Sequence, residues 1–268
     1  MLNKEWMIQA SHLSKEYDGK KALTDVSFSI SAKGIHGILG PKGAGKSTLM
    51  DLLCGCETAN EGEILLQGAP VSKQKGKIGY VPESPEFYAT MTVLETLDFV
   101  GEIRGVSADK RYRQIKEAVE LMDLESVRNR LIRHLTKEEK KKVALAAALL
   151  GNTELVLIDE PLWGKNAVKQ KETQNLFAML GKHKTVIVAS ENFSLIRDLC
   201  EDVLILSEGS VIAQDTFAGL EEKLLRKDGA PSLEAVYESL VELSRSTCME
   251  ESSGSLFGND ENGKERDV

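Results

Sequence analysis

The stretch that decides the fold runs from residue 35 to residue 54. It reads Ile35-His-Gly-Ile-Leu-Gly40-Pro-Lys-Gly-Ala-Gly45-Lys-Ser47-Thr-Leu-Met-Asp-Leu-Leu-Cys54. The first five residues are mostly apolar and suit a short strand, whereas the residues from Ser47 onward have apolar side chains at helical spacing. A glycine-rich loop separates the two. The order strand, loop, helix is typical of a parallel sheet with crossover helices, so this stretch predicts an α/β fold.

The glycine-rich loop fits the pattern G-x-x-x-x-G-K-[ST], which is typical of phosphate binding. Glycines let backbone N–H groups turn inward around phosphate oxygens, and the positive end of the next helix adds to the attraction. In such a loop Lys46 reaches the β- and γ-phosphates, and the Ser47 hydroxyl ligates Mg²⁺. The alternative is a chance glycine turn, which the flanking strand and helix disfavour. The candidate phosphate-binding residues are Gly40, Pro41, Lys42, Gly43, Ala44, Gly45, Lys46, Ser47 and Thr48.

A second acidic element lies in the stretch Leu155-Val-Leu-Ile-Asp159-Glu160-Pro161. It places two carboxylates at the carboxyl end of a buried strand, where ligands bind in open α/β sheets. We expect Asp159 to hold Mg²⁺ through water and Glu160 to polarise the water that attacks the γ-phosphate. Two solvated acids at a strand end are the alternative, which the phosphate loop in the same chain disfavours.

The composition and net charge of the chain limit the kinds of partner that it can bind. The chain has 268 residues, of which 41% are hydrophobic, and its 42 acidic against 34 basic residues give a net charge of −8. This balance argues against a dedicated nucleic-acid binder, which needs a basic stripe. No apolar run approaches the roughly 18 to 20 residues that span a bilayer. The longest apolar run, 143–150, predicts a buried helix. Because no run is long enough to span a bilayer, we expect any membrane role to be played from the cytoplasmic side.

The rest of the chain divides into recognisable parts. Strands are expected at 22–30, 155–158 and 185–189, and a hairpin at 202–213. The residues from about 86 to 150 predict an all-helical insert, with one apolar stripe made of Tyr112, Ile115, Val119 and Met122.

Domain boundaries follow from the same patterns. We expect one domain over residues 1–228, with the helical insert inside it. Ser232 predicts the N-cap of a C-terminal helix over 229–245. Residues 246–268 are rich in Ser, Gly, Asn and charge, a composition that predicts a disordered tail.

From residue 7 to about 225 the chain resembles the ATP-binding subunits of ABC transporters. The pattern is closest to exporters of the drug-resistance and peptide-antibiotic-immunity type. The resemblance extends beyond the phosphate loop and the strand-end acidic pair. The passage into the family's helical subdomain is matched by Gly79-Tyr-Val-Pro82 followed by Met91-Thr-Val-Leu-Glu. Residues 131–135 followed by residues 143–152 match the helix that carries the family signature. Tyr17 matches the aromatic residue that stacks on adenine, although a surface tyrosine at a strand end is the alternative.

This resemblance implies a P-loop NTPase core with a mixed, largely parallel sheet, an N-terminal antiparallel β part and an all-helical insert. It implies ATP and Mg²⁺ as ligands and no nucleic-acid partner. In the family, two subunits sandwich two ATP molecules head to tail, so Thr136, Lys137 and Glu138 would face the ATP of a second ATP-binding subunit. Dimer closure then acts on membrane permease subunits, which places the chain in the cytoplasm, peripheral on the inner face of the cell membrane.

Four positions depart from the family pattern. Glu83 stands where a glutamine is expected, and its carboxylate could still ligate Mg²⁺ or a water. Glu138 replaces a signature glycine whose backbone must approach the partner's γ-phosphate closely. Glu191 replaces the switch histidine, and Asn166 replaces an aspartate in the loop after Pro161. Trp163 in that loop is expected to pack beneath it.

These departures predict a handicapped ATPase. A histidine stabilises the transferring phosphoryl group, whereas two like charges about 4 Å apart cost about 4 kcal/mol at an effective dielectric of about 20, less what Mg²⁺ offsets. Neither a homodimer nor a heterodimer with an intact partner yields a complete site. We therefore expect retained ATP binding and slow hydrolysis impaired by Glu83, Glu138 and Glu191.

Two functions stay open from the sequence. The first is a peripheral ATPase that drives an exporter permease, and the second is a weakly hydrolysing or non-hydrolysing regulatory or assembly subunit. The lysine run from 137 to 142, interrupted by Glu138 and Glu139, predicts the solvated face of the signature helix.

Overall fold

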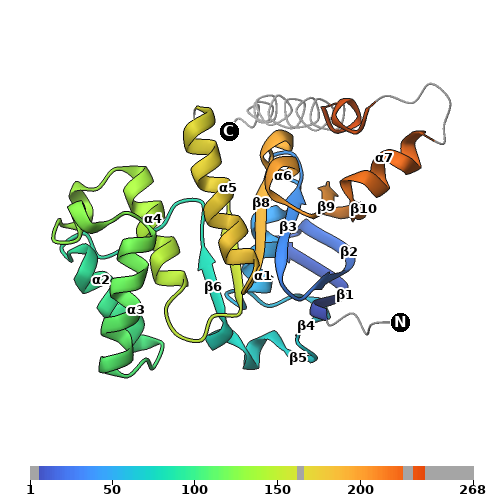
Figure 1. The fold of residues 1–268 in the computed structure, drawn as a ribbon. Coiled ribbons are helices and arrows are strands. Elements are labelled where there is room, and N and C mark those ends of the chain that lie inside the picture. The colour runs from blue at the N-terminus through green and yellow to red at the C-terminus, as the bar shows by residue number, and fades with distance from the viewer. Residues whose placement is uncertain (1–5, 162–165, 226–231, 239–268) are drawn as a thin grey trace, which may run out of the picture.

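The computed structural model describes residues 6–161, 166–225 and 232–238, and within them the strands form two sheets (Figure 1). The smaller sheet is antiparallel and has the strand order β2-β1-β4-β5. Its members are β1 (Trp6–Tyr17), β2 (Lys20–Ser31), β4 (Glu61–Leu66) and β5 (Ala69–Pro70). The sequence predicted this antiparallel part at the N-terminus, and the fold confirms it.

The larger sheet has six strands in the order β10-β9-β3-β8-β7-β6. All neighbouring pairs are parallel except β9 and β10, which form the predicted hairpin. The prediction of a mixed, largely parallel sheet is therefore confirmed. The strands are β3 (Gly34–Leu39), β6 (Ile78–Val81), β7 (Leu155–Asp159), β8 (Thr185–Ser190), β9 (Asp202–Ser207) and β10 (Ser210–Thr216).

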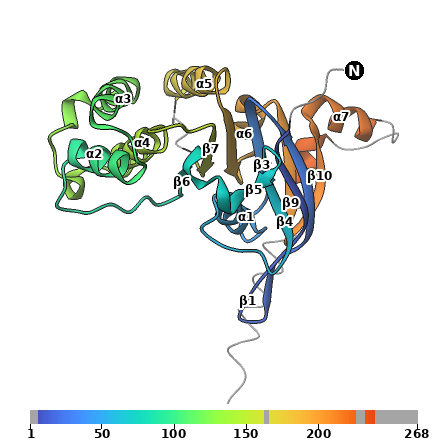
Figure 2. The same ribbon diagram turned by 90° about the horizontal axis from the view of Figure 1, so that it is seen from below.

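Both faces of the larger sheet are buried, because alternate residues of each strand enter different apolar clusters. Leu155 and Leu157 of β7 join the cluster that contains helix α1 (Lys46–Leu53) and the antiparallel sheet. Val156 and Ile158 join the cluster that contains α5 (Ala167–Gly181) and α6 (Phe193–Leu199). Figure 2 shows α1 and α5 on opposite sides of this sheet. The sheet therefore lies between two layers. The carboxyl ends of the parallel strands β3, β7 and β8 point in the same direction and lie at one end of the sheet.

Three longer helices lie between β6 and β7 in the chain and form the left part of Figure 1. They are α2 (Val93–Ile103), α3 (Ala108–Leu121) and α4 (Lys137–Ala148). Both α2 and α4 begin with a capping box, in which a threonine and a glutamate three residues later bond each other's backbone N–H groups. The predicted apolar stripe holds for Ile115, Val119 and Met122, which are buried.

The prediction that Tyr112 belongs to this apolar stripe was wrong, because Tyr112 is 74% exposed. Its position on α3 precedes Ile115 by three residues and so passes the spacing test, yet its ring lies outside the contact with α2 and α4. Helical spacing alone cannot show where the apolar stripe of a helix ends.

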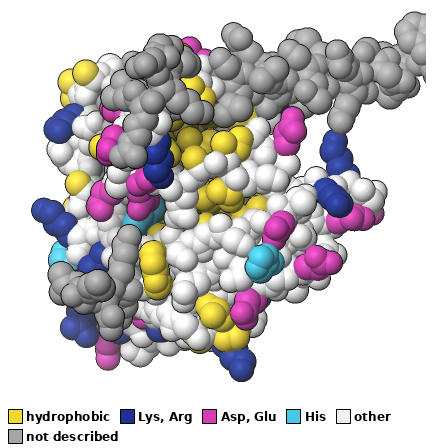
Figure 3. All heavy atoms as spheres, turned by 90° about the vertical axis from the view of Figure 1, so that its right-hand side faces the viewer, with side chains coloured by type: hydrophobic (Ala, Val, Ile, Leu, Met, Phe, Trp, Pro, Cys, Tyr) yellow, Lys and Arg dark blue, Asp and Glu magenta, His cyan; other side chains and the backbone are white. Residues whose placement is uncertain are grey.

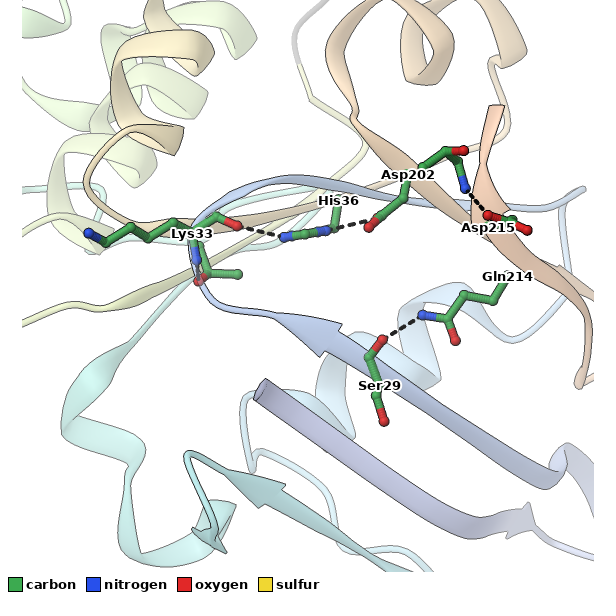
Figure 4. A network of polar contacts seen from close by, with 8 residues as sticks. Ser29, Lys33, His36, Asp202, Gln214 and Asp215 are labelled. Carbon is green, nitrogen blue, oxygen red and sulfur yellow. Dashed lines mark hydrogen bonds and ion pairs between the residues drawn. The ribbon is translucent and has the colours of Figure 1, made fainter. Parts of the chain in front are cut away.

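A buried histidine fixes the register of β3 against β9 (Figure 4). His36 is paired with Asp202 in the two strands, and its Nδ1 lies 2.8 Å from Asp202 Oδ1. Its Nε2 lies 2.9 Å from the carbonyl oxygen of Lys33. Because both ring nitrogens face acceptors, the doubly protonated ring satisfies the two contacts best. In the same view Gln214 Nε2 donates to the carbonyl oxygen of Ser29 across 2.6 Å, which ties β10 to β2.

The described C-terminal part comprises α7 (Phe217–Leu225) and a short helix over 233–238. Ser232 caps the short helix, since its Oγ accepts a hydrogen bond of 3.2 Å from the N–H of Ala235. The remainder of the predicted helix 229–245, the predicted tail 246–268 and Trp163 lie outside the described residues.

Figure 3 shows the face of the molecule that includes this C-terminal part. Hydrophobic side chains gather near its middle, and acidic and basic side chains are interspersed around its edge. In the portion of the chain that the structure describes, every helix is too short or too polar to cross a membrane.

Candidate nucleotide-binding site

The phosphate loop connects the end of β3 to the start of α1. Gly43 and Gly45 have φ values of 84° and 97°, a left-handed conformation that glycine adopts without strain. A Cβ atom on Gly45 would also lie 2.6 Å from the carbonyl oxygen of Ala22 on β2. Glycine is therefore required at position 45 for two separate reasons, the backbone conformation and the close approach of the antiparallel sheet.

Lys46 folds its side chain back over this loop. Its Nζ donates hydrogen bonds to the carbonyl oxygens of Gly40 and Pro41, at 2.9 and 3.0 Å. The side chain is 8% exposed, and burial lowers the pKa of Lys46, an effect that the carboxylates of Glu160 and Glu191 oppose. The loop thus holds a buried cation at the point where the phosphates of a nucleotide would be cradled.

Asp159 and Glu160 follow each other where β7 ends. Burial raises the pKa of Asp159, against the opposing effect of a hydrogen bond with Ser47. Glu160 has a φ of 47°, so the backbone turns sharply out of the strand at this residue. Its carboxylate is held from β8 and the loop after it, because Ser190 Oγ donates to Oε2 at 2.8 Å and the Glu191 N–H donates to Oε1 at 3.1 Å. Burial raises the pKa of Glu160 as well.

These groups surround a cavity of about 700 Å³ at the carboxyl ends of β3 and β7. It brings together residues that the sequence predicted from five separate stretches. Its lining is made of Tyr17, Lys20, Lys21, Ala22, Lys42, Gly43, Gly45, Lys46, Ser47, Thr48, Glu83, Asp159, Glu160 and Glu191. Of the predicted loop residues, Gly40, Pro41 and Ala44 are buried and are not part of this lining.

Tyr17 stands at the end of β1, beside the mouth of the cavity. Its ring is 41% exposed, and Lys15 Nζ lies 4.8 Å from the ring centroid. An exposed ring next to a phosphate loop is the arrangement that stacking on a purine base requires. Tyr17 lines the cavity, and its stacking on adenine stays a prediction.

The signature residues lie apart from this cavity, at the N-terminus of α4. The side chain of Thr136 accepts a hydrogen bond from the Glu139 N–H, and the Thr136 N–H donates to Glu139 Oε2 at 2.7 Å. This backbone hydrogen bond lowers the pKa of Glu139. Lys137 and Glu138 are exposed, and Glu138 lies 3.9 Å from Lys169 of α5. The carboxylate of Glu139 therefore already caps the helix N-terminus.

The predicted solvated lysine run was wrong at Lys141. This side chain is 7% exposed, and its Nζ donates to the carbonyl oxygens of Glu83 and Asp159, both at 2.8 Å. Burial lowers the pKa of Lys141, while the carboxylates of Asp159, Glu83 and Glu160 act in the opposite direction. A helical signal was present in the sequence, because position 141 precedes the buried Leu145 and Ala148 by four and seven residues.

Two further contacts were not expected from the sequence. Ser190 was read only as part of a strand end, and its hydroxyl proves to hold Glu160. The hydroxyl of Tyr237 donates to the carbonyl oxygen of Glu191 across 2.7 Å, which links the C-terminal helix to the cavity wall. Both depend on segments that are 30 and 46 residues apart, so no local pattern predicts them.

The donor set fits Mg²⁺ bound together with a polyphosphate. Within the described ranges no group of three or more His, Cys, Asp or Glu side chains could hold a metal by itself. Mg²⁺ is commonly held by one or two carboxylates, a hydroxyl and the phosphates of its substrate. Asp159 and Ser47 lie close enough to share a hydrogen bond and are a carboxylate and a hydroxyl of that kind, and the carboxylate of Glu83 lines the same cavity.

Comparisons with known proteins agree with this site. The sequence profile described as "ABC transporter" matches residues 23–163. The lipopolysaccharide export system ATP-binding protein LptB of Haemophilus influenzae is 30% identical over 219 residues, covering 78% of this chain and 90% of that protein. The methionine import ATP-binding protein MetN 2 of Enterococcus faecalis is 30% identical over 225 residues, covering 78% and 64%.

Solved structures show the same fold. The ATP-binding subunit of an ABC transporter superimposes with a TM-score of 0.77 at 23% identity, covering 87% of this chain and 99% of that one. The dimeric cassette MJ0796, in a post-hydrolysis state bound to ADP and Pi, gives 0.72 at 24% identity, covering 78% and 98%. The architecture is thus that of a P-loop nucleotide-binding cassette.

The chain belongs to the ATP-binding proteins of the ABC transporter family. The family resemblance inferred from the sequence is confirmed at this level, and with it the nucleotide-binding character of the fold. One relative above is named for export and the other for import, so the family assignment leaves the direction of transport open.

Proposed function

We propose that this chain binds Mg-ATP in the cavity at the ends of β3 and β7 and hydrolyses it slowly. We further propose that it pairs with a second ATP-binding subunit and drives a membrane permease from the inner face of the cell membrane. One observation carries the proposal: Lys46, Ser47, Asp159 and Glu160 line a single cavity that opens beside Tyr17. We also propose that residues 1–228 form one domain, which a C-terminal helix follows.

Each part of the cavity has a chemical task in this proposal. The ring of Tyr17 stacks on adenine, and the loop from Gly40 to Thr48 cradles the phosphates. Ser47 and Asp159 would hold Mg²⁺, with Glu83 as a further carboxylate at the same cavity. The metal, when bound, neutralises charge on the phosphates. Glu160 accepts a proton from the attacking water, and its burial, which raises its pKa, suits a general base.

Slow hydrolysis follows from the acids that line the cavity. Glu191 and Glu83 face the same space as Glu160, in positions where the family resemblance leads one to expect histidine and glutamine. A carboxylate offers no donor to the transferring phosphoryl group and repels it. The Glu191 N–H bonds to Glu160, so a substitution of the Glu191 side chain can leave that backbone contact in place.

The signature end of α4 supports the same conclusion for the second site. In a head-to-tail pair Thr136, Lys137 and Glu138 would face the partner's ATP. The N–H of Thr136 is already bonded to Glu139, and Glu138 adds a second carboxylate at this end. Two acids at a helix N-terminus oppose the approach of a phosphate that the bare helix end would attract.

The helical insert provides a surface for the permease. Tyr88 and Phe99 stack edge-on with their centroids 5.7 Å apart, and they are 63% and 37% exposed. Ile103 at the end of α2 is also exposed. Exposed aromatic groups of this kind favour docking of another protein. We further propose that the permease is an exporter of the drug-resistance or peptide-antibiotic-immunity type, which the sequence pattern of this chain resembles.

The test is the hydrolysis rate of the purified chain and of its Glu191→His variant, measured as phosphate release. We expect slow release by the native chain and a rise of about tenfold in the variant, the factor that about 1.4 kcal/mol of barrier represents. Rapid hydrolysis by the native chain contradicts the proposal. A stable complex with a multi-span membrane protein supports the transporter role, whereas a soluble complex with a cytosolic protein supports the regulatory alternative.

A further inference from the structure

Lys141 differs from the other lysines at the start of α4. Lys137 is exposed, and Lys142 is 33% exposed at its side chain and lies 3.9 Å from Asp123 at the surface. Lys141 points inward instead. Among the residues that the structure describes, Lys46 and Lys141 are the buried lysines. Lys46 lines the nucleotide cavity, whereas Lys141 lies outside that lining and reaches the backbone of two residues that belong to it.

The ammonium of Lys141 joins three segments of the chain. It stands on the second turn of α4, and its two acceptors belong to the residue after Pro82 and to the last residue of β7. Those acceptors are backbone carbonyl oxygens of Glu83 and Asp159, whose side chains line the cavity. A displacement of either residue toward a bound metal or phosphate therefore moves an acceptor of Lys141.

Charge gives the contact a second consequence. Glu83, Asp159, Glu160 and Glu191 place four carboxylates at one cavity, which by themselves repel a polyphosphate. The ammonium of Lys141 interacts electrostatically with three of these carboxylates, those of Asp159, Glu83 and Glu160. A buried ammonium is costly unless it is paired, so the acids and the lysine stabilise one another.

We propose that Lys141 is a positioning residue of the nucleotide site, which ties α4 to Glu83 and Asp159 and thereby transmits Mg-ATP binding to the signature end of that helix. The positive charge of Lys141 also offsets part of the negative charge of the carboxylates that line the cavity, and so strengthens ATP binding. This inference rests on the proposed function, because it requires that the cavity binds ATP. A lysine that only filled space would make neither contribution.

The experiment compares three variants of the full chain. Lys141→Met removes the donors and the charge, Lys141→Arg keeps both, and Lys142→Met is the matched control on the surface of the same turn. Binding of ATP is measured by calorimetry with and without Mg²⁺. Backbone amide exchange over residues 136–142 is followed by mass spectrometry before and after Mg-ATP is added, and thermal unfolding shows which variants are folded.

We expect Mg-ATP to slow exchange over 136–142 in the native chain and in Lys142→Met. Lys141→Met should lose this protection and bind ATP about tenfold more weakly, as removal of one buried charge near a polyphosphate predicts, while Lys141→Arg restores at least half of both effects. The inference is overturned if folded Lys141→Met keeps full protection and affinity. If Lys141→Met does not fold, Lys141→Arg decides: it must keep at least half of the native protection and affinity, and a larger loss in a folded variant overturns the inference.

Absence of ATP binding by the native chain is a different failure. That result contradicts the proposed function itself. Loss of protection in Lys142→Met as well would show that the effect belongs to the helix surface and would also overturn the role of Lys141.

Discussion

Ser190 donates a hydrogen bond of 2.8 Å from its Oγ to Oε2 of Glu160, across the gap between the ends of β8 and β7. The same Oγ accepts a hydrogen bond of 3.1 Å from the N–H of Asn192, which fixes the orientation of the hydroxyl. Glu160 is therefore positioned by a neighbouring strand as well as by its own. In the proposed role of Glu160 as general base, this contact would keep the carboxylate oriented when water and substrate enter.

Ser190→Ala tests whether this contact serves hydrolysis. Loss of a hydrogen bond to a charged carboxylate predicts a fall in phosphate release of at least about tenfold, since such bonds contribute roughly 1.5 to 3 kcal/mol and about 1.4 kcal/mol of barrier is tenfold in rate. Glu160→Gln should lower the rate further. In the double variant, Ser190→Ala should have no added effect, because its partner is no longer a base. An equal fall in the native and Glu160→Gln backgrounds would contradict this role.

Lys46→Ala tests the phosphate loop. We expect ATP to stabilise the native chain because it should bind the folded state alone, and removing the buried ammonium at the loop should abolish that stabilisation. The measurement is the shift of the unfolding temperature on addition of ATP and Mg²⁺. Lys116→Ala, at an exposed position of α3, is the control and should keep the native shift. A full shift in Lys46→Ala would show that the loop is not the binding site.

Tyr237→Phe tests the link between the C-terminal helix and the cavity wall. The change keeps the ring stacked on Phe193, whose centroid is 5.9 Å away, and removes only the hydroxyl that bonds to Glu191. We expect a loss of about 1 kcal/mol in the free energy of unfolding and faster amide exchange over residues 191–193. Tyr112→Phe on exposed α3 is the control. Unchanged exchange at 191–193 would argue against the link.

The contact of His36 with Asp202 predicts a pH dependence of stability. Burial alone would lower the pKa of His36, but the hydrogen bond and charge of Asp202 raise it above the ordinary value of 6.5. The stabilisation is therefore fully present below pH 6.5 and is lost as the pH rises through the higher pKa of the folded state.

Asp202→Asn removes the group that contributes most to raising the pKa of His36. Between about pH 6 and pH 8 the free energy of unfolding of the native chain should fall more than that of the variant, as measured by denaturant titration. Equal slopes in the two proteins would contradict the assignment. Glu201, which also acts on His36, remains in both and does not affect the comparison.

Local patterns predicted most of the site because its chemistry is concentrated in short stretches. The spacing of Gly40, Gly45 and Lys46 fixes a loop between a strand and a helix, and Asp159 follows a buried run. Such features depend on backbone conformation and on strand ends, which neighbouring residues decide. The hairpin of β9 and β10 was predictable for the same reason, since Glu208 and Gly209 turn the chain locally with φ values of 48° and 73°.

Contacts between distant segments were beyond such patterns. Tyr112 has the spacing of a buried residue and is exposed, whereas Lys141 has the polarity of a surface residue and is buried. The difference arises because burial depends on which neighbours pack against a helix, and a sequence window does not contain those neighbours.

The sequence by itself determined that the chain has an α/β core, a phosphate loop and a strand-end pair of acids, because each of these features depends on residues that are close together in the sequence. Only the tertiary structure decided that Lys141 is placed behind Asp159, that Ser190 holds Glu160 and that Tyr237 reaches Glu191. Those contacts join segments that lie far apart in the chain: α4 to the end of β7, the end of β8 to Glu160, and the C-terminal helix to the residue after β8. Their energies depend on burial, which arises only when the whole chain is folded.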